Sequence, residues 1–198
     1  MATERTGRII LLNGASSSGK SSIGRALLPL LADPWFFVPA DAIAEMRSTV
    51  HTRVLDETDI SEMLRRTRLG YHRAVAALTS AGNHVIMDYP LSEQWRMTDL
   101  LTTLAGYDVT LVEVRCSAEE LKRRERDRGD RPLGLAESQT VVYAHGEFDI
   151  AVDTTNTGPD ECARMIVRGL DATAFPKAFD RLRQRLPPDR RSGTTTLL

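Results

Sequence analysis

The sequence predicts a single α/β domain built on a doubly wound, five-stranded parallel sheet with helices on both faces. Three observations support this fold class: short, nearly continuous apolar runs end at turn residues, segments with helical spacing lie between them, and a glycine- and serine-rich loop follows the first run. Strands of a parallel sheet are buried on both faces, so they appear as unbroken apolar runs. A chain of 198 residues is most simply one domain.

The apolar runs define the expected strands. Four are strong, at residues 7–13, 35–40, 84–89 and 108–115, and a weaker fifth covers residues 149–153. Each is short enough for a strand and is bounded by glycine, proline, asparagine or aspartate. Because helical segments separate them, the strands are expected to run parallel.

The helices are expected at residues 20–31, 60–81, 92–104 and 158–170, with another that opens at the capping box Ser117-x-x-Glu120. In the second, apolar side chains recur at helical spacing, at Met63, Leu64, Tyr71, Val75 and Leu78. The composition changes near residue 172. We therefore expect a main domain over 1–171 and a C-terminal segment over 172–198, with one amphipathic helix in "AFPKAFDRLRQRL" and a disordered tail.

The overall charge points to no polyanionic partner. The net charge is −1, so bulk electrostatics favour neither nucleic acid nor an anionic membrane. The longest aliphatic run, residues 9–12, is far too short to span a membrane, and the start of the chain lacks the apolar region of a signal peptide. The two cysteines and four histidines show no metal-ligand spacing. A cytoplasmic protein is the expectation.

The loop after the first strand carries the strongest motif. "GASSSGKS", residues 14–21, matches G-x-x-x-x-G-K-[ST]. Glycines let backbone N–H groups surround a phosphate, and the following helix adds the positive end of its dipole. Lys20 would contact the β- and γ-phosphates, and the hydroxyl of Ser21 would bind Mg²⁺. A serine-rich turn is the alternative, but the flanking strand and helix favour an ATP-binding loop. Its expected members are Gly14, Ala15, Ser16, Ser17, Ser18, Gly19, Lys20, Ser21 and Ser22.

A second motif distinguishes a kinase from a GTPase. The guanine-binding N-K-x-D and the D-x-x-G pattern occur nowhere, whereas "KRRERDRGDR", residues 122–131, resembles the arginine-rich lid of a small kinase. Most of this charge run is expected to be a solvated helix face. The Gly129-Asp130-Arg131-Pro132 stretch should end the helix and place Arg128 and Arg131 on a loop that can close over phosphate. Arg124 is expected to contact ATP as well.

Two aspartates follow predicted strands. Asp41 ends "WFFVPAD" and Asp88 ends "HVIMD", so both should lie at the carboxyl edge of the sheet, where ligands bind. Either carboxylate is a candidate contact for the substrate. Asp41 is a candidate base, but it could equally cap the next helix, "AIAEM". Asp88 could bind magnesium or contact the substrate.

Together these motifs resemble the chloramphenicol phosphotransferase family, small P-loop kinases that use ATP to phosphorylate an antibiotic hydroxyl. The resemblance runs from about residue 9 to residue 166 and includes "IILLNGASSSGKSS", "PW" before the strand that ends at Asp41, "VIMD", "RGDRPLGLAESQ", "FDIAVDTT" and "ECA". It implies that Asp41 is the catalytic base, that Lys20 and Arg131 stabilise charge, and that Ser21 is the magnesium ligand.

The expected activity is ATP- and Mg²⁺-dependent transfer of the γ-phosphate to a hydroxyl of a small molecule. An antibiotic acceptor, phosphorylated for resistance or self-protection, is the first expectation. The segment after Asp41 differs from that of the drug-modifying member, so the acceptor stays open. The alternatives are a kinase of a nucleoside, sugar or shikimate-like acid, and a nucleotide-dependent regulator or toxin. Homo-oligomers are compatible with the sequence, and neither nucleic acid nor a membrane is expected as partner.

Overall fold

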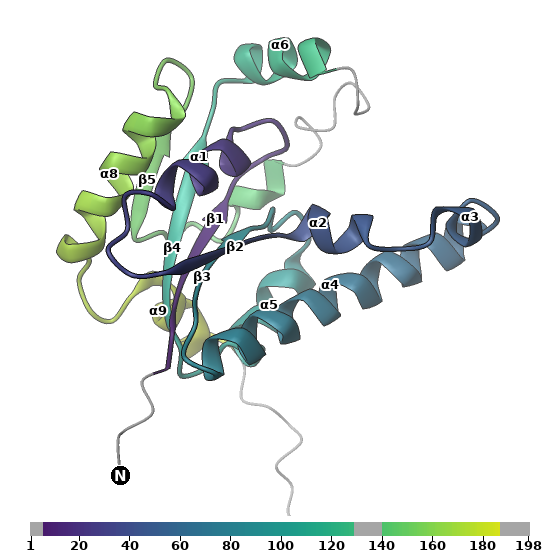
Figure 1. Ribbon diagram of the computed structural model, residues 1–198, viewed down its shortest axis with the longest axis horizontal. Coiled ribbons are helices and arrows are strands. Elements are labelled where there is room, and N and C mark those ends of the chain that lie inside the picture. The colour runs from purple at the N-terminus through teal and green to yellow at the C-terminus, as the bar shows by residue number, and fades with distance from the viewer. Residues whose placement is uncertain (1–5, 129–139, 187–198) are drawn as a thin grey trace, which may run out of the picture.

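The expected parallel sheet is present and has five strands. The computed structural model describes residues 6–128 and 140–186. Within them the strands are β1 (Arg8–Asn13), β2 (Trp35–Pro39), β3 (His84–Asp88), β4 (Asp108–Arg115) and β5 (Ile150–Asp153), in the order β2-β3-β1-β4-β5. All four pairings are parallel, so each connection must cross a face of the sheet (Figure 1).

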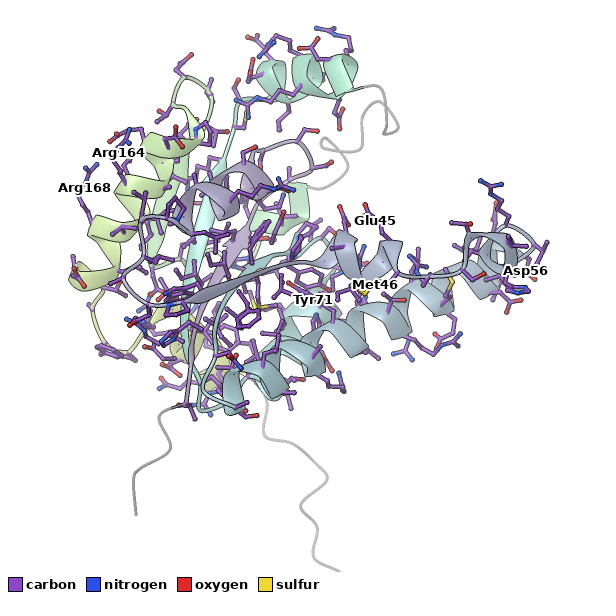
Figure 2. The ribbon with its side chains drawn as sticks, in the orientation of Figure 1. Glu45, Met46, Asp56, Tyr71, Arg164 and Arg168 are labelled. Atoms are coloured by element: carbon purple, nitrogen blue, oxygen red, sulfur yellow. The ribbon has the colours of Figure 1, made fainter. Side chains whose placement is uncertain are left out.

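One face of the sheet is covered by α1 (Lys20–Leu27) and α8 (Pro159–Ala172). Ile10 and Leu12 of β1 are buried there against Ile23 and Leu27 of α1 and Ile166 of α8. In contrast, Arg164 and Arg168 project outward from α8 and pair with Glu161 (Figure 2). This division into a buried and a charged side is the pattern of an amphipathic surface helix.

The opposite face is covered by α4 (Glu57–Ser80), α5 (Gln94–Thr103) and α9 (Ala178–Gln184). Ile9 and Leu11, which alternate with the residues of the first face, are buried here with Tyr71 of α4 and Phe179 of α9. The hydroxyl of Tyr71 donates to the carbonyl of Val38 at 2.7 Å. The alternation explains why the β1 run had to be apolar throughout.

Helix boundaries differ from the expected ones at several places. α1 ends at Leu27 rather than at residue 31, and α4 begins at Glu57, after Asp56 caps it by accepting from the Asp59 N–H at 2.8 Å. Two short helices, α2 (Ala40–Glu45) and α3 (Thr49–Thr52), precede α4 and extend away from the sheet (Figure 1). α6 (Ala118–Arg128) and the 3₁₀ turn Thr140–Tyr143 complete the described elements.

The C-terminal segment forms a shorter helix than expected. The sequence "AFPKAFDRLRQRL" was predicted to be one helix, but only Ala178–Gln184 is helical. Pro176 lacks a backbone N–H and disfavours helical geometry in the residue before it, so the helix begins only after it. α9 buries Ala178, Phe179 and Leu182 in the main core. Residues 187–198, which carry the predicted tail, lie outside the described residues.

Strand register sets three chain segments at one edge of the sheet. Leu12 of β1 is paired with Asp88 of β3, and Asp88 is paired with Pro39 of β2. These strands therefore end at the same level. The glycine-rich loop, Asp88 and the start of α2 are brought together there, as expected for the carboxyl edge of a doubly wound sheet.

Candidate active site

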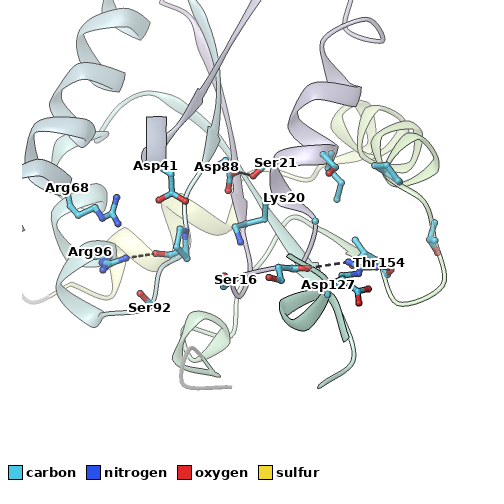
Figure 3. Close-up of a pocket in the computed structure, with 18 residues that line it drawn as sticks. Ser16, Lys20, Ser21, Asp41, Arg68, Asp88, Ser92, Arg96, Asp127 and Thr154 are labelled. Atoms are coloured by element: carbon cyan, nitrogen blue, oxygen red, sulfur yellow. Dashed lines mark hydrogen bonds between the residues drawn. The ribbon is translucent and has the colours of Figure 1, made fainter. Parts of the chain in front are cut away.

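A cleft of about 550 Å³ opens at this edge of the sheet (Figure 3). We call the side formed by the glycine-rich loop, α6 and the start of α8 the loop half, and the side formed by α2, α4 and the β3–α5 connection the acceptor half. The loop half is lined by Ser16, Ser17, Gly19, Lys20, Ser21, Ser22, Ile23, Arg124, Asp127, Thr154, Thr157 and Pro159. The acceptor half is lined by Asp41, Arg68, Asp88, Pro90, Ser92 and Arg96.

The loop has the backbone geometry that the motif requires. Gly19, immediately before α1, has a φ of 91°, a left-handed conformation that glycine adopts without steric cost. Gly14 lies so close to β4 that a Cβ atom would stand 2.4 Å from the carbonyl oxygen of Val114. The two glycines of the motif are therefore required by a left-handed turn and by a close backbone approach.

Lys20 folds its side chain back along the loop. It is only 7% exposed, and its Nζ donates to the carbonyls of Gly14 at 2.8 Å and Ala15 at 2.6 Å. The charge is thereby held inside the ring of the loop, at the floor of the cleft. An ammonium in this position can contact phosphate oxygens that enter the loop.

Ser21 and Asp88 are direct neighbours. The hydroxyl of Ser21 donates to Oδ2 of Asp88 at 2.5 Å, which joins the start of α1 to the end of β3 (Figure 3). A serine hydroxyl beside a carboxylate offers two hard oxygen ligands, the type that Mg²⁺ prefers. No cluster of three or more acidic, histidine or cysteine side chains suited to a metal occurs among the described residues, so protein side chains alone do not enclose an ion there.

Asp41 lies in the acceptor half, at the expected edge of the sheet, but it is not the last residue of a strand. β2 ends at Pro39, and Asp41 is in the first turn of α2 rather than at the strand end. The N-cap position is occupied by Pro39 and no side chain caps the helix, so the capping interpretation of Asp41 is wrong. Its exposed carboxylate faces the cleft opposite Lys20 (Figure 3).

Arg124 connects α6 to the loop. Its guanidinium donates to the Thr154 carbonyl at 2.6 Å, to the Thr154 hydroxyl at 3.1 Å and to the Ser17 carbonyl at 3.4 Å, while Glu120 accepts from Nε at 2.7 Å. Thr154, which also donates to the Ser18 carbonyl at 2.9 Å, had not been assigned a role. Its position directly after a predicted strand was the available signal.

The other lid arginines are only partly described. Arg128 was expected on a loop, but its backbone forms the last residue of α6. Arg131, with the rest of the Gly129-Asp130-Arg131-Pro132 stretch, lies outside the described residues.

Two arginines of the acceptor half were not among the site residues predicted from the sequence. Arg68 comes from α4 and Arg96 from α5, and both line the cleft beside Asp41 (Figure 3). A signal for Arg68 did exist: it lies three residues before the buried Tyr71, within the apolar stripe of its helix. A charged side chain in such a stripe is unexpected unless it has a polar environment to face. For Arg96 we find no comparable pattern.

The remaining candidates lie away from the cleft. None of His51, His72, His84 and His145 lines it, and His72 is instead buried with its Nδ1 2.5 Å from Asp99 Oδ2. Cys162 is buried and Cys116 is half-buried. In the part of the chain that the structure describes, no helix has the length and apolar character needed to cross a membrane.

Comparison with known families supports the motif assignment. A family model described as chloramphenicol phosphotransferase-like protein matches residues 7–171. A protein of Mycobacterium tuberculosis named "Putative O-phosphotransferase", found in strains CDC 1551 and H37Rv, is 32% identical over 209 residues. That alignment covers 93% of this chain and 92% of the relative.

Several solved structures, two of them kinases, share the fold. The tunicamycin resistance protein of Deinococcus radiodurans has a TM-score of 0.62 at 18% identity and covers 83% of this chain and 95% of its own. Shikimate kinase from Acinetobacter baumannii, in complex with shikimate, has a TM-score of 0.61 at 16% identity, with 85% and 95% covered. A gluconokinase from Sinorhizobium meliloti has a TM-score of 0.59 at 21% identity, with 85% and 94% covered. At these identities the likeness establishes the fold.

Proposed function

Because the chain belongs to the chloramphenicol phosphotransferase-like family and is therefore an ATP-dependent phosphotransferase, we propose that it moves the γ-phosphate of ATP to a hydroxyl of a small molecule bound in the acceptor half of the cleft. The observation that carries the proposal is the placement of Asp41 opposite Lys20 in one cleft, at the edge where the Ser21–Asp88 pair stands. These are a base, a charge stabiliser and a magnesium-type ligand pair within one site.

The proposed step is an in-line transfer. The acceptor hydroxyl oxygen forms a bond to the γ-phosphorus as the bond to the β–γ bridging oxygen breaks, and ADP leaves with that electron pair. The carboxylate of Asp41 takes the hydroxyl proton. The ammonium of Lys20 stabilises negative charge on the transferring group. Phosphoryl transfer is mainly positioning and charge stabilisation, so groups fixed on strand and helix ends suit it.

The magnesium site is proposed at Ser21 and Asp88. Their oxygens, 2.5 Å apart, fit a cation that keeps several water and phosphate ligands and takes only one or two from the protein. When bound, Mg²⁺ would neutralise charge on the β- and γ-phosphates. Under this assignment Asp88 binds the magnesium ion and does not contact the acceptor.

Two classes of acceptor are proposed. Membership of the family supports a hydroxylated antibiotic, with resistance or self-protection as its consequence. The charged side chains in the acceptor half, Arg68 and Arg96, favour a polar metabolite instead. Both classes share the same reaction, and they differ in the group that the walls of the cleft recognise.

A screen for acceptor-dependent ADP formation tests the proposal. Purified protein with ATP and Mg²⁺ is incubated with hydroxylated antibiotics and with common hydroxylated metabolites. We expect ADP release that depends on one class and is lost in Lys20→Met, which keeps most of the side-chain stem but removes the charge. ADP release that no acceptor stimulates, but that a protein partner does, would instead favour a nucleotide-dependent regulator.

A further inference from the structure

The acceptor half contains a half-buried cation with unused hydrogen-bond donors. Arg68 lines the cleft from α4, and its Nε and Nη1 atoms are buried with no hydrogen-bond partner. Burial lowers the pKa of Arg68, and the neighbouring charge of Arg96 lowers it further. Guanidinium N–H groups that are removed from water without a hydrogen-bond acceptor cost free energy. The presence of Arg68 in an apolar helix stripe therefore calls for a ligand that offsets this cost.

Arg96 supplies a second, preorganised guanidinium. Its side chain is only 12% exposed, its Nη1 donates to the Pro90 carbonyl at 3.1 Å, and its Nη2 pairs with Glu93. The group lies over the ring of Tyr89, 5.6 Å from the centroid. These contacts fix its plane, yet Nε is buried without a partner. An arginine held in this way loses little freedom when it binds an oxyanion.

Charges of both signs surround Arg68. The charges of Arg96 and Arg47 lower its pKa, whereas the charge of Asp41 raises it. Within the lining of the acceptor half, the guanidinium groups of Arg68 and Arg96 are matched in number by the carboxylates of Asp41 and Asp88. Neither carboxylate pairs with Nε or Nη1 of Arg68, which have no hydrogen-bond partner. An acceptor with an anionic group would supply acceptor oxygens for these donors.

We infer that the acceptor carries, besides its hydroxyl, an oxyanion of the carboxylate or phosphate type, which Arg68 and Arg96 bind while the hydroxyl faces Asp41. Planar guanidinium groups bind the paired oxygens of carboxylates and phosphates through parallel N–H···O bonds. Arg68 and Arg96 then determine specificity, and Asp41 acts on the hydroxyl. That the bound anion belongs to the acceptor of a phosphotransfer rests on the proposed function. That Arg68 and Arg96 form an anion site does not.

Sulfate binding tests the anion site without any need for turnover. The protein is saturated with Mg²⁺ and the ATP analogue AMPPNP, and its melting midpoint is compared in sulfate and in chloride at equal ionic strength. We expect sulfate at ten times its Kd to raise the wild-type midpoint by about 3–6 °C beyond its effect on Arg68→Met. The matched control is Arg66→Met on the same helix, since Arg66 is 65% exposed at its side chain and should behave as wild type. Equal sulfate shifts in wild type and Arg68→Met would overturn the inference.

Paired acceptors test the same site in the reaction. Hydroxy acids are compared with their neutral carboxamides as acceptors for the γ-phosphate. We expect kcat/KM to be at least about 100-fold higher for the acid of a productive pair, because the amide leaves buried donors unpaired. Arg68→Met should remove this preference and raise the acceptor KM, with little change in the KM for ATP. An amide used as well as its acid would contradict the inference. If no compound is phosphorylated, the proposed function fails, and the sulfate result still decides the anion site.

Discussion

Replacing Asp41 by asparagine tests whether Asp41 acts as the catalytic base or only stabilises helix α2. α2 has only six residues and its N-cap is Pro39, so Asp41 does not cap it. The substitution removes one negative charge from the first turn, which costs at most about 1 kcal/mol. For a chain of this size the melting midpoint should therefore fall by no more than about 2–4 °C. A lost general base should lower kcat at least about 100-fold, which is about 2.7 kcal/mol of transition-state stabilisation.

The assay combines steady-state kinetics, ATP binding and thermal melting on Asp41→Asn. The matched control is Glu45→Gln, which removes the same charge from the exposed last residue of the same helix (Figure 2). Glu45 is not among the residues that line the cleft. We expect normal ATP binding in both variants and a loss of turnover only in Asp41→Asn. An Asp41→Asn protein with nearly wild-type kcat would refute the reasoning and leave Asp88 as the next candidate base.

Three further predictions concern the residues expected to act on ATP and Mg²⁺. Lys20→Met should retain less than about a tenth of the wild-type rate in the phosphotransfer assay, since its charge acts on the β- and γ-phosphates; a larger residual rate would disprove that role. Arg128→Ala and Arg131→Ala should each lower turnover, by up to about 10³-fold, with unchanged melting midpoints. Variants that melt several degrees lower and turn over normally would make them fold residues instead. Asp88→Asn should raise the Mg²⁺ concentration for half-maximal turnover about tenfold in a titration, because the proposed site would lose its carboxylate ligand; an unchanged Mg²⁺ dependence would move Asp88 to another role.

The sheet and the loop could be predicted because their signals are local. Ile9 to Leu12 had to be apolar without interruption since their side chains alternate between two buried faces. The glycines of the loop follow from backbone geometry that other residues adopt only with strain. Both requirements are present in short stretches of sequence, so the strands, their parallel arrangement and the phosphate loop were confirmed.

The walls of the acceptor half could not be derived in the same way. Arg68 and Arg96 stand on helices separated by β3, and they meet only because strand order brings α4 and α5 to the same face. The short helices α2 and α3 have too few residues for a periodic pattern, so the sequence placed Asp41 before the helix rather than in its first turn. Which residues of distant helices meet depends on the tertiary fold. The sequence signal for this site is Arg68, a charged residue within the apolar stripe of its helix.

The most direct test of the account is to identify the molecule that receives the γ-phosphate. ³¹P NMR of a reaction with ATP, Mg²⁺ and an acceptor found in the screen distinguishes a phosphate monoester from inorganic phosphate. The account predicts a new monoester signal on the acceptor oxygen, formed one-to-one with ADP by the wild type and at less than about a tenth of that rate by Lys20→Met. Release of inorganic phosphate at the same rate with and without acceptor would contradict it.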